Sequence, residues 1–329
     1  MRALKVLLAG VLLAGALVIA GGVWFWHQLN TPIPPPVGGA IVSIAPGEPF
    51  RQVSTRLEET GIVRHAWVVH WWARWSGEDR LVRSGDYRFS EPGSPLDVLQ
   101  TLRSAGAALN RVTIPECRTI RDVAVLLEAA GLGGADEFLC LAREPRFLMS
   151  LDLPASGIEG YLFPDTYDFA WTTPPGDVLR YMVDRFRRQT ADLHQRLQGS
   201  GMTEEDMVIL ASVIESETGA AAERPIISGV FHNRLRIGMR LQADPTAVYE
   251  RGGGKPTAND LKIDSPYNTY IHQGLPPGPI CNPGLAAMEA AVEPANVPYL
   301  YFVARQDGTH AFSHTLDEHN RAVAALRQQ

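Results

Sequence analysis

Two glutamates stand at the end of an apolar helical segment, residues 202–219, and one of them continues its apolar face. Glu217 follows Ile214 by three positions and Leu210 by seven, whereas Glu215 lies about 200° around the helix axis from Glu217. A carboxyl group on an apolar face loses its hydration, so its protonated form is favoured and its pKa rises. A general acid that works near neutral pH needs this property, and we predict that role for Glu217.

The spacing alone leaves a second interpretation open, in which Glu217 simply ends the helix in solvent. Other catalytic patterns in the sequence are incomplete. Residues 252–255 (GGGK) resemble a phosphate-binding loop, but Tyr and Pro stand where that loop needs Gly and Ser or Thr. His310 and His314 have the spacing of a zinc-protease helix, yet no Glu follows His310. We therefore predict no metal site and no cofactor.

The segment that carries Glu217 has clear helix signals at both ends. Thr203 stands three positions before Asp206, which predicts a capping box at the start, and Gly219 predicts the stop. Around it the pattern predicts a strand at 111–114 and helices at 119–130, 134–142, 176–197 and 222–237. We therefore predict an α+β fold, with a larger α+β catalytic domain over residues 111–329.

A smaller α+β module is predicted over residues 40–110. Its expected elements are strands at 40–45 and 84–89 and helices at 50–61, 66–75 and 94–102. The second of these helices carries four tryptophans, Trp67, Trp71, Trp72 and Trp75. Such tryptophans could stack on sugar rings, but their spacing favours one buried helix face.

The N-terminus has the composition of a membrane anchor. Residues 6–26 carry no charge, and roughly 20 apolar residues suffice to cross a bilayer. Arg2 and Lys5 precede this stretch and Trp24 and Trp26 close it, which predicts a cytoplasmic tail over residues 1–5. A cleaved signal peptide is the alternative, although its apolar region is usually shorter. The Pro-rich residues 27–39 then predict a semi-rigid linker.

Composition limits the classes of partner. The 329 residues carry a net charge of −6 and are 45% hydrophobic, which indicates a globular protein and argues against nucleic acid as a partner. Three cysteines, Cys117, Cys140 and Cys281, are too few for a disulfide framework. One disulfide could form in an oxidising compartment, and the sequence does not decide it.

Long motifs across the chain resemble one family. The run 211–218 (ASVIESET) resembles the signature of the YceG-like endolytic murein transglycosylases, the MltG family. Further segments resemble that family in the same order: 159–167 (EGYLFPDTY), 231–242 (FHNRLRIGMRLQ), 244–246 (DPT), 265–270 (SPYNTY), 274–278 (GLPPG), 282–284 (NPG) and 298–303 (PYLYFV). The resemblance therefore spans nearly the whole chain.

The resemblance implies a membrane-anchored lyase that acts on peptidoglycan. Such enzymes cleave the MurNAc–GlcNAc bond within glycan strands and leave 1,6-anhydroMurNAc ends, and we expect that this ends the elongation of nascent strands. The family implies a LysM-like small module, a single pass through the inner membrane and a catalytic domain in the periplasm. Expected partners are glycan strands, the inner membrane, peptidoglycan synthases and divisome or elongasome proteins.

The resemblance also points to individual residues. The step Glu217–Thr218 resembles the Glu–Ser step of other lytic transglycosylases and goose-type lysozymes, which favours Glu217 over Glu215 as the acid. Candidate substrate-binding residues are Glu159, Tyr161, Asp165, Asn233, Gln242, Asp244, Thr246, Tyr267, Asn268 and Tyr270. Each could instead serve the fold, as polar side chains often do. A hydrolytic muramidase and a non-catalytic wall-binding scaffold remain alternative functions.

Overall fold

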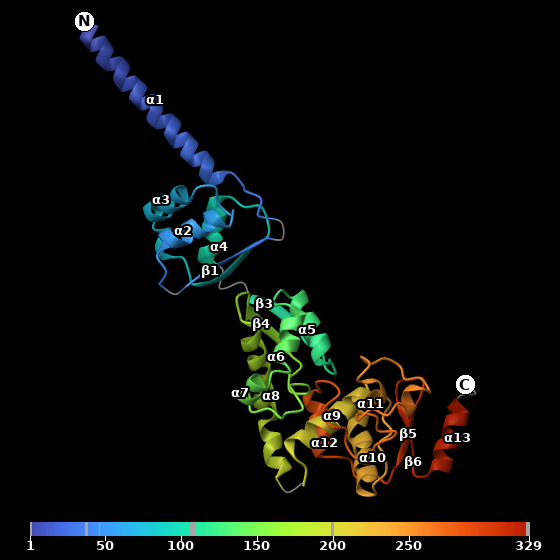
Figure 1. Ribbon diagram of the computed structural model, residues 1–329. Helices are drawn as coiled ribbons and strands as arrows, with labels where there is room; N and C mark the ends of the chain where they lie inside the picture. Colours follow the sequence, from blue (N-terminus) through green and yellow to red (C-terminus); the bar gives the residue numbers. More distant parts are fainter. Residues whose placement is uncertain (1, 37–38, 46, 105–108, 199–200, 327–329) are drawn as a thin grey trace. The chain divides into compact units, whose positions relative to one another are not determined.

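The chain divides into two compact units. A computed structural model describes residues 2–36, 39–45, 47–104, 109–198 and 201–326. One unit comprises Met1–Asn110 with Asp168–Thr172, and the other comprises Arg111–Tyr167 with Thr173–Gln329 (Figure 1). In the described residues helices alternate with short strands that pair two at a time, so the α+β class is confirmed.

The first unit folds around one small core. Its elements are α1 (Arg2–Asn30), β1 (Ala40–Ile44), α2 (Phe50–Glu59), α3 (Ala66–Ser76), the 3₁₀ turn η1 (Glu78–Arg80), β2 (Gly85–Phe89) and α4 (Pro95–Ser104). Strands β1 and β2 pair antiparallel, with Val42 opposite Tyr87. Both side chains are buried with Leu57 and Leu102, and the Tyr87 hydroxyl donates to the Leu102 carbonyl at 3.1 Å. The strands and helices predicted over residues 40–104 are confirmed.

Helix α1 is long and apolar enough to cross a membrane. The stretch Gly10–Asn30 has a mean hydropathy of 1.7, and its residues are exposed except near its end, where Leu29 is buried. The helix continues to Asn30, four residues beyond the uncharged segment, and the Asn30 side chain donates back to the Trp26 carbonyl at 2.9 Å. An anchor and a signal sequence share this length and composition.

The tryptophans of α3 depart from the prediction. Trp67, Trp71 and Trp75 expose 51%, 62% and 79% of their surface, so the expected buried tryptophan face is wrong. Only Trp72 packs partly against the core. Val68, Val69 and Ala73 occupy the buried side of α3 instead. Because residues four apart share one face of a helix, the other three tryptophans fall together on the opposite side.

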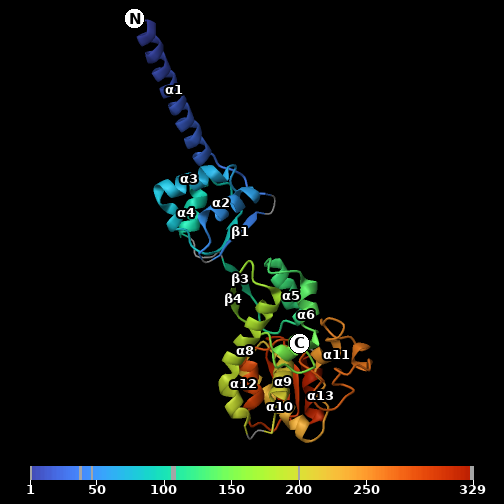
Figure 2. The same ribbon diagram turned by 60° about the vertical axis from the view of Figure 1, so that its left-hand side comes forward.

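The second unit surrounds a buried central helix. Its elements are α5 (Ile120–Ala129), α6 (Ala135–Leu141), α7 (Pro145–Ser150), α8 (Pro175–Leu197), α9 (Glu204–Glu217), η2 (Ala221–Glu223), α10 (Arg224–Arg236), α11 (Asp244–Val248), η3 (Asp260–Lys262), α12 (Leu285–Val292), β5 (Tyr301–Ala304), β6 (His310–Ser313) and α13 (Leu316–Leu326). Strand β5 pairs antiparallel with β6. Strand β3 (Leu109–Thr113) pairs with β4 (Thr166–Ala170), and each of these two strands contains residues of both units. Helix α9 packs on α10, α11 and α12 (Figures 1 and 2).

Candidate active site

Helix α9 holds Glu217 in a fixed position. At its start, the Thr203 hydroxyl accepts from the Asp206 N–H at 3.1 Å and the Asp206 carboxylate accepts from the Thr203 N–H at 3.1 Å, so the predicted capping box is confirmed. Every residue from Met207 to Glu215 is buried. A helix that is packed on all sides cannot rotate without breaking its core contacts, so the direction of Glu217 at its end is set by the fold.

Glu217 opens into a cavity of about 500 Å³. Besides Glu217, the lining residues are Arg234, Gln242, Asp244, Tyr270, Tyr301, Phe302, Val303, Ala304, His310, Leu316 and His319. They come from α10, the segment 242–244, the loop before residue 271, the β5–β6 hairpin and α13. The cavity is large enough for a small-molecule site and combines aromatic walls with a few polar groups.

The surroundings of Glu217 keep its carboxyl group protonated. Burial, with a smaller contribution from the negative charge of Asp244, raises the pKa of Glu217 to about 8. The Arg234 charge and a backbone hydrogen bond from Asp244 oppose these effects and are smaller. The prediction that Glu217 is desolvated and has a raised pKa is therefore confirmed. At neutral pH this group carries a proton that it can donate.

Arg234 is held against the cavity by backbone carbonyls. Its Nε donates to the Leu300 carbonyl at 2.7 Å and one of its terminal nitrogens donates to the Leu241 carbonyl at 2.5 Å. The guanidinium also lies 5.4 Å from the centre of the Tyr301 ring, within cation–π distance. Arg234 thus joins α10 to the two segments that border the cavity, and it places a positive charge near Glu217.

Asp244 and Tyr270 form a pair on the cavity wall. The Tyr270 hydroxyl donates to the Asp244 carboxylate at 2.7 Å. Burial, followed by the hydrogen bond to Asp244, raises the pKa of Tyr270 above its ordinary range. Next to them, Gln242 has a φ of 50°, a left-handed conformation that non-glycine residues rarely adopt. Such strain is often found at functional sites.

The sequence profile of the YceG-like family matches residues 42–325. The chain belongs to the YceG-like family. Proteins named endolytic murein transglycosylase from Bacillus subtilis (strain 168) and Streptococcus pneumoniae serotype 2 (strain D39) are 28% and 29% identical to it, over 93% and 94% of this chain. The matches cover 90% of the Bacillus protein and 63% of the Streptococcus protein. The crystal structure of a YceG-like protein from Listeria monocytogenes matches 86% of this chain and 99% of its own, with a TM-score of 0.62 and 31% identity.

Four of the site residues predicted for this YceG-like chain meet in the cavity: Glu217, Gln242, Asp244 and Tyr270. Two others support its wall from behind. The buried Thr246 hydroxyl lies 2.8 Å from the Thr269 hydroxyl, and Asn268 donates to the Ile263 carbonyl at 2.8 Å. These two residues therefore position the loops that carry Asp244 and Tyr270.

Three predicted residues make their contacts elsewhere in the second unit. Tyr161 is buried with its ring against Phe186, at a centroid distance of 5.1 Å. Asp165 forms an ion pair with Arg185 at 2.7 Å. Asn233 donates to the carbonyl of Val297 at 2.7 Å. In this structure all three serve packing or loop attachment.

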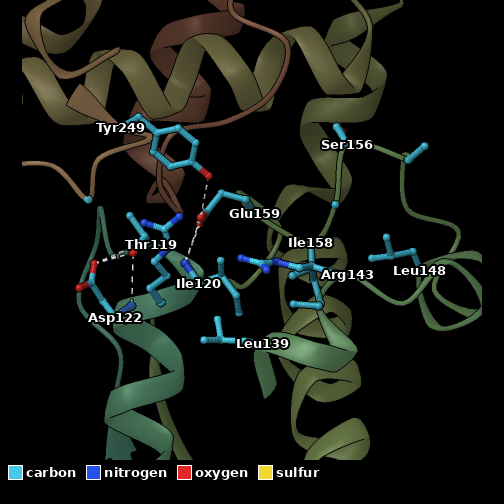
Figure 3. A pocket seen from close by; sticks show the side chains of 15 residues that line it. Thr119, Ile120, Asp122, Leu139, Arg143, Leu148, Ser156, Ile158, Glu159 and Tyr249 are labelled. Carbon is cyan, nitrogen blue, oxygen red and sulfur yellow. Dashed lines mark hydrogen bonds between the residues drawn. The ribbon is translucent and has the colours of Figure 1, made fainter. Parts of the chain in front are cut away.

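Glu159 lines a second cavity, of about 360 Å³, which Glu217 does not border (Figure 3). Its carboxylate accepts from the Ile120 N–H at the start of α5 at 3.0 Å, from the Asn282 amide at 3.0 Å and from the Tyr249 hydroxyl at 3.2 Å. Burial raises the pKa of Glu159 to about 7 against these hydrogen bonds. The ring of Tyr267 lies 4.7 Å from that of Tyr249, so this predicted residue belongs to the same surroundings.

Glu215 faces away from the Glu217 cavity. Its carboxylate accepts from Arg224 at 2.6 Å and from the Gly284 N–H at 3.1 Å, and the side chain is buried. It thus ties α9 to the start of α10 and the start of α12. The two neighbouring glutamates therefore have different surroundings, as their angular separation on the helix requires.

Several cavity residues were not among the predicted site residues: Arg234, Tyr301, His310 and His319. Arg234 and Tyr301 lie within the family-like segments 231–242 and 298–303, so that resemblance could have identified them. His310 and His319 stand outside those segments. Among the described residues, no group of three or more His, Cys, Asp or Glu side chains is arranged to hold a metal ion.

Proposed function

We propose that this protein is an endolytic murein transglycosylase, a lyase that cleaves the MurNAc–GlcNAc bond within peptidoglycan glycan strands and leaves 1,6-anhydroMurNAc ends. The observation that carries the proposal is a single glutamic acid, Glu217, with a pKa of about 8 at the wall of a cavity of about 500 Å³. The Bacillus and Streptococcus relatives are named endolytic murein transglycosylases, which supports the same reaction.

In this mechanism Glu217 acts twice. Its carboxyl group first donates a proton to the glycosidic oxygen as the bond to C1 breaks. The resulting carboxylate then takes the proton from the C6 hydroxyl of the same muramic acid, and the C6 oxygen attacks C1. Because the nucleophile belongs to the substrate, the reaction is intramolecular and no water has to be positioned.

The other polar groups of the cavity have supporting roles. Positive charge develops on the sugar ring in an oxocarbenium-like transition state, and the Asp244 carboxylate is the negative group of the lining that can stabilise it. Tyr270 orients Asp244 through their hydrogen bond. Gln242 completes the substrate-binding wall that we propose, and Thr246 and Asn268 hold its loops from behind. Tyr267 and Glu159 at the second cavity, and Tyr161, Asp165 and Asn233 elsewhere in the unit, support that wall through the fold.

The test is a digest of purified glycan strands, analysed by mass spectrometry. Anhydro ends are lighter than reducing ends by one water, about 18 Da, because C1 is bonded to the sugar's own O6 and no water is added. We expect anhydro products from the native protein and none from Glu217→Gln. Glu204→Gln, on the exposed first turn of the same helix, is the matched control and should be fully active. Reducing ends would establish a hydrolytic muramidase, and full activity of Glu217→Gln would exclude Glu217 as the acid.

The domain organisation is part of the proposal. We assign residues 1–5 to a cytoplasmic tail, 6–26 to a single membrane span, 27–39 to a linker, 40–110 to a LysM-like subdomain and 111–329 to the catalytic domain. The apolar α1 supports the span, and the inner membrane is its expected site. An alkaline phosphatase fused after residue 40 should be active, whereas one fused after residue 5 should be inactive. A mature protein that lacks residues 1–26 would indicate a cleaved signal sequence.

We further propose that cleavage close to the membrane ends the elongation of nascent strands, and that peptidoglycan synthases and divisome or elongasome proteins are its partners. The expected result is longer glycan strands in cells that carry Glu217→Gln. If that variant restored normal strand lengths to a strain without the protein, the chain would instead act as a non-catalytic wall-binding scaffold.

A further inference from the structure

Two cysteines from distant parts of the chain meet behind α9. The segment before α5 and the segment before α12 pair through their backbones, since the Cys117 N–H donates to the Asn282 carbonyl at 2.9 Å and the Asn282 N–H donates to the Arg118 carbonyl at 3.0 Å. Within this pairing the Sγ atoms of Cys117 and Cys281 lie 2.6 Å apart. Cys117 also has a φ of 56°, an unusual conformation for a residue with a side chain.

We propose that Cys117 and Cys281 are a disulfide-forming pair. Formation of this bond needs a disulfide as oxidant, either that of another protein or oxidised glutathione. The Cys117 thiolate attacks that disulfide and releases one thiol, and the Cys281 thiolate then attacks Cys117 Sγ and releases the second. The pair gives up two protons and two electrons, and the oxidant is reduced to two thiols.

The surroundings of the two thiols favour this order of attack. Cys117 is half-buried, and hydrogen bonds from Cys281 and Ser216 lower the pKa of its thiol. Cys281 is buried, and burial raises the pKa of its thiol. The more accessible and more acidic thiol therefore meets the oxidant first.

The disulfide would lie beside the last turn of α9, the helix that carries Glu217. Ser216, which precedes Glu217, has its hydroxyl 3.0 Å from Cys117 Sγ and 2.8 Å from the Ser212 carbonyl. The crosslink closes a loop between residues 164 positions apart in sequence, and long loops gain the most from closure. It would hold the segments before α5 and α12 together where both touch the last turn of α9.

The test uses purified full-length protein equilibrated with oxidised glutathione, then alkylated and digested without reductant. We expect a peptide that links Cys117 to Cys281, with the exposed Cys140 outside the link. Cys140→Ser should still give this peptide, and Cys117→Ser should abolish it. Absence of the linked peptide from the native protein, or its replacement by links to Cys140, would overturn the proposal. Because the readout is a covalent mass, it is independent of activity.

A second inference comes from the exposed tryptophans of α3. Trp67, Trp71 and Trp75 recur every four residues on one side of the helix, and α1 meets that helix with its last turns. The ring of Trp24 stacks on Trp67 at 5.8 Å, and the ring of Trp26 meets Trp72 at 5.8 Å. The last turns of the apolar helix and the tryptophans of α3 thus form one continuous aromatic surface.

We infer that this aromatic surface lies in the headgroup region of the bilayer that α1 crosses, an inference that rests on the proposed membrane anchor. Tryptophan concentrates at membrane interfaces because its ring is apolar and its N–H is polar. Since Trp24 and Trp26 close the apolar stretch of α1, their ring contacts bring α3 to the same depth. The exposed Arg64 and Arg74 flank the surface and can meet lipid phosphates, Arg74 having only a loose ion pair with Asp79 at 4.0 Å.

The test places the full-length protein in phosphatidylcholine vesicles with and without bromine on the upper acyl chain, which quenches nearby tryptophans. Replacing Trp67, Trp71 and Trp75 together by Phe should reduce the absolute emission lost to bromine. If the triple variant lost as much emission to bromine as the native protein, the inference would be overturned. If the native protein bound glycan strands and the triple variant did not, the surface would be a sugar-binding site instead. A second variant, Trp24→Phe with Trp26→Phe, tests the anchor separately. If α1 crosses the bilayer, this variant should also lose less emission to bromine than the native protein does, whereas without a membrane anchor the loss should be unchanged.

Discussion

Replacing Glu217 by Gln should make the protein more stable, and by an amount that depends on pH. A glutamic acid has an ordinary pKa of 4.5, and burial raises that of Glu217 to about 8. The folded state therefore binds a proton that the unfolded state releases between these two values. Stability is unaffected below about pH 4.5 and falls as the pH rises towards 8. Glutamine has nearly the same shape and carries no charge at any pH, so Glu217→Gln removes this loss.

The magnitude follows from the two pKa values. Each pH unit above 4.5 costs about 1.4 kcal/mol, so the variant should gain about 3 kcal/mol at pH 7 and less than about 1 kcal/mol at pH 5. For a domain of about 200 residues this corresponds to a rise in Tm of roughly 6–12 °C at pH 7. The assay measures the Tm of the unit that contains α9 by circular dichroism, at several pH values from 5 to 8. Both proteins are measured in one detergent.

The control for this measurement is Glu289→Gln, because Glu289 is an exposed glutamate on α12 of the same unit. Its Tm difference from the native protein should be small and nearly the same at pH 5 and pH 8. A Glu217→Gln gain that did not grow over this range would refute the reasoning, because it would mean that Glu217 is not buried as a protonated acid.

Three further predictions concern neighbouring residues. In a pH profile of kcat/KM, activity should fall tenfold per pH unit above about pH 8, where Glu217 loses its proton. Asp244→Asn should move this alkaline limb to lower pH, because the negative charge of Asp244 helps to raise the pKa of Glu217. An alkaline limb that did not move would contradict this. Glu215→Gln should cost about 2 kcal/mol in urea denaturation, since the buried Arg224 loses its carboxylate at 2.6 Å and keeps only the more exposed Glu116 at 3.4 Å, and a loss below about 1 kcal/mol would show that the Glu215–Arg224 pair is unimportant. Gln242→Gly should leave stability unchanged or raise it by about 1 kcal/mol because it relieves a φ of 50°, while activity falls if the Gln side chain binds substrate.

The sequence predicted the limits of the two longest helices of the second unit well, although it missed the eleven-residue α13. Helices α8 and α9 are within one or two residues of their predicted limits. Helices α11 and α12 were missed, and both are short pieces of five and eight residues inside polar or Pro-rich segments. Such pieces owe their form to tertiary contacts, such as the packing of α12 on α9, more than to local propensity.

The site shows the same limit. Glu217 was predictable because burial follows from its position on an apolar helix face. The partners of Asn268 and Thr246 were not, because a side chain that braces a loop and one that binds sugar have the same residue type. The tryptophans of α3 show a further limit. Helical spacing predicted correctly that three of them share one face, but it does not determine whether that face is buried or exposed.

The raised pKa explains how one carboxyl group could serve both halves of the proposed reaction. A glutamate of ordinary pKa would be ionised at pH 7 and would have no proton to give, and once ionised it would be a weak base. With a pKa of about 8, Glu217 is mostly protonated before cleavage, and its carboxylate afterwards binds a proton more strongly than an ordinary glutamate does. The apolar face of α9 that removes water from this residue is therefore also what allows the same group to act as acid and then as base.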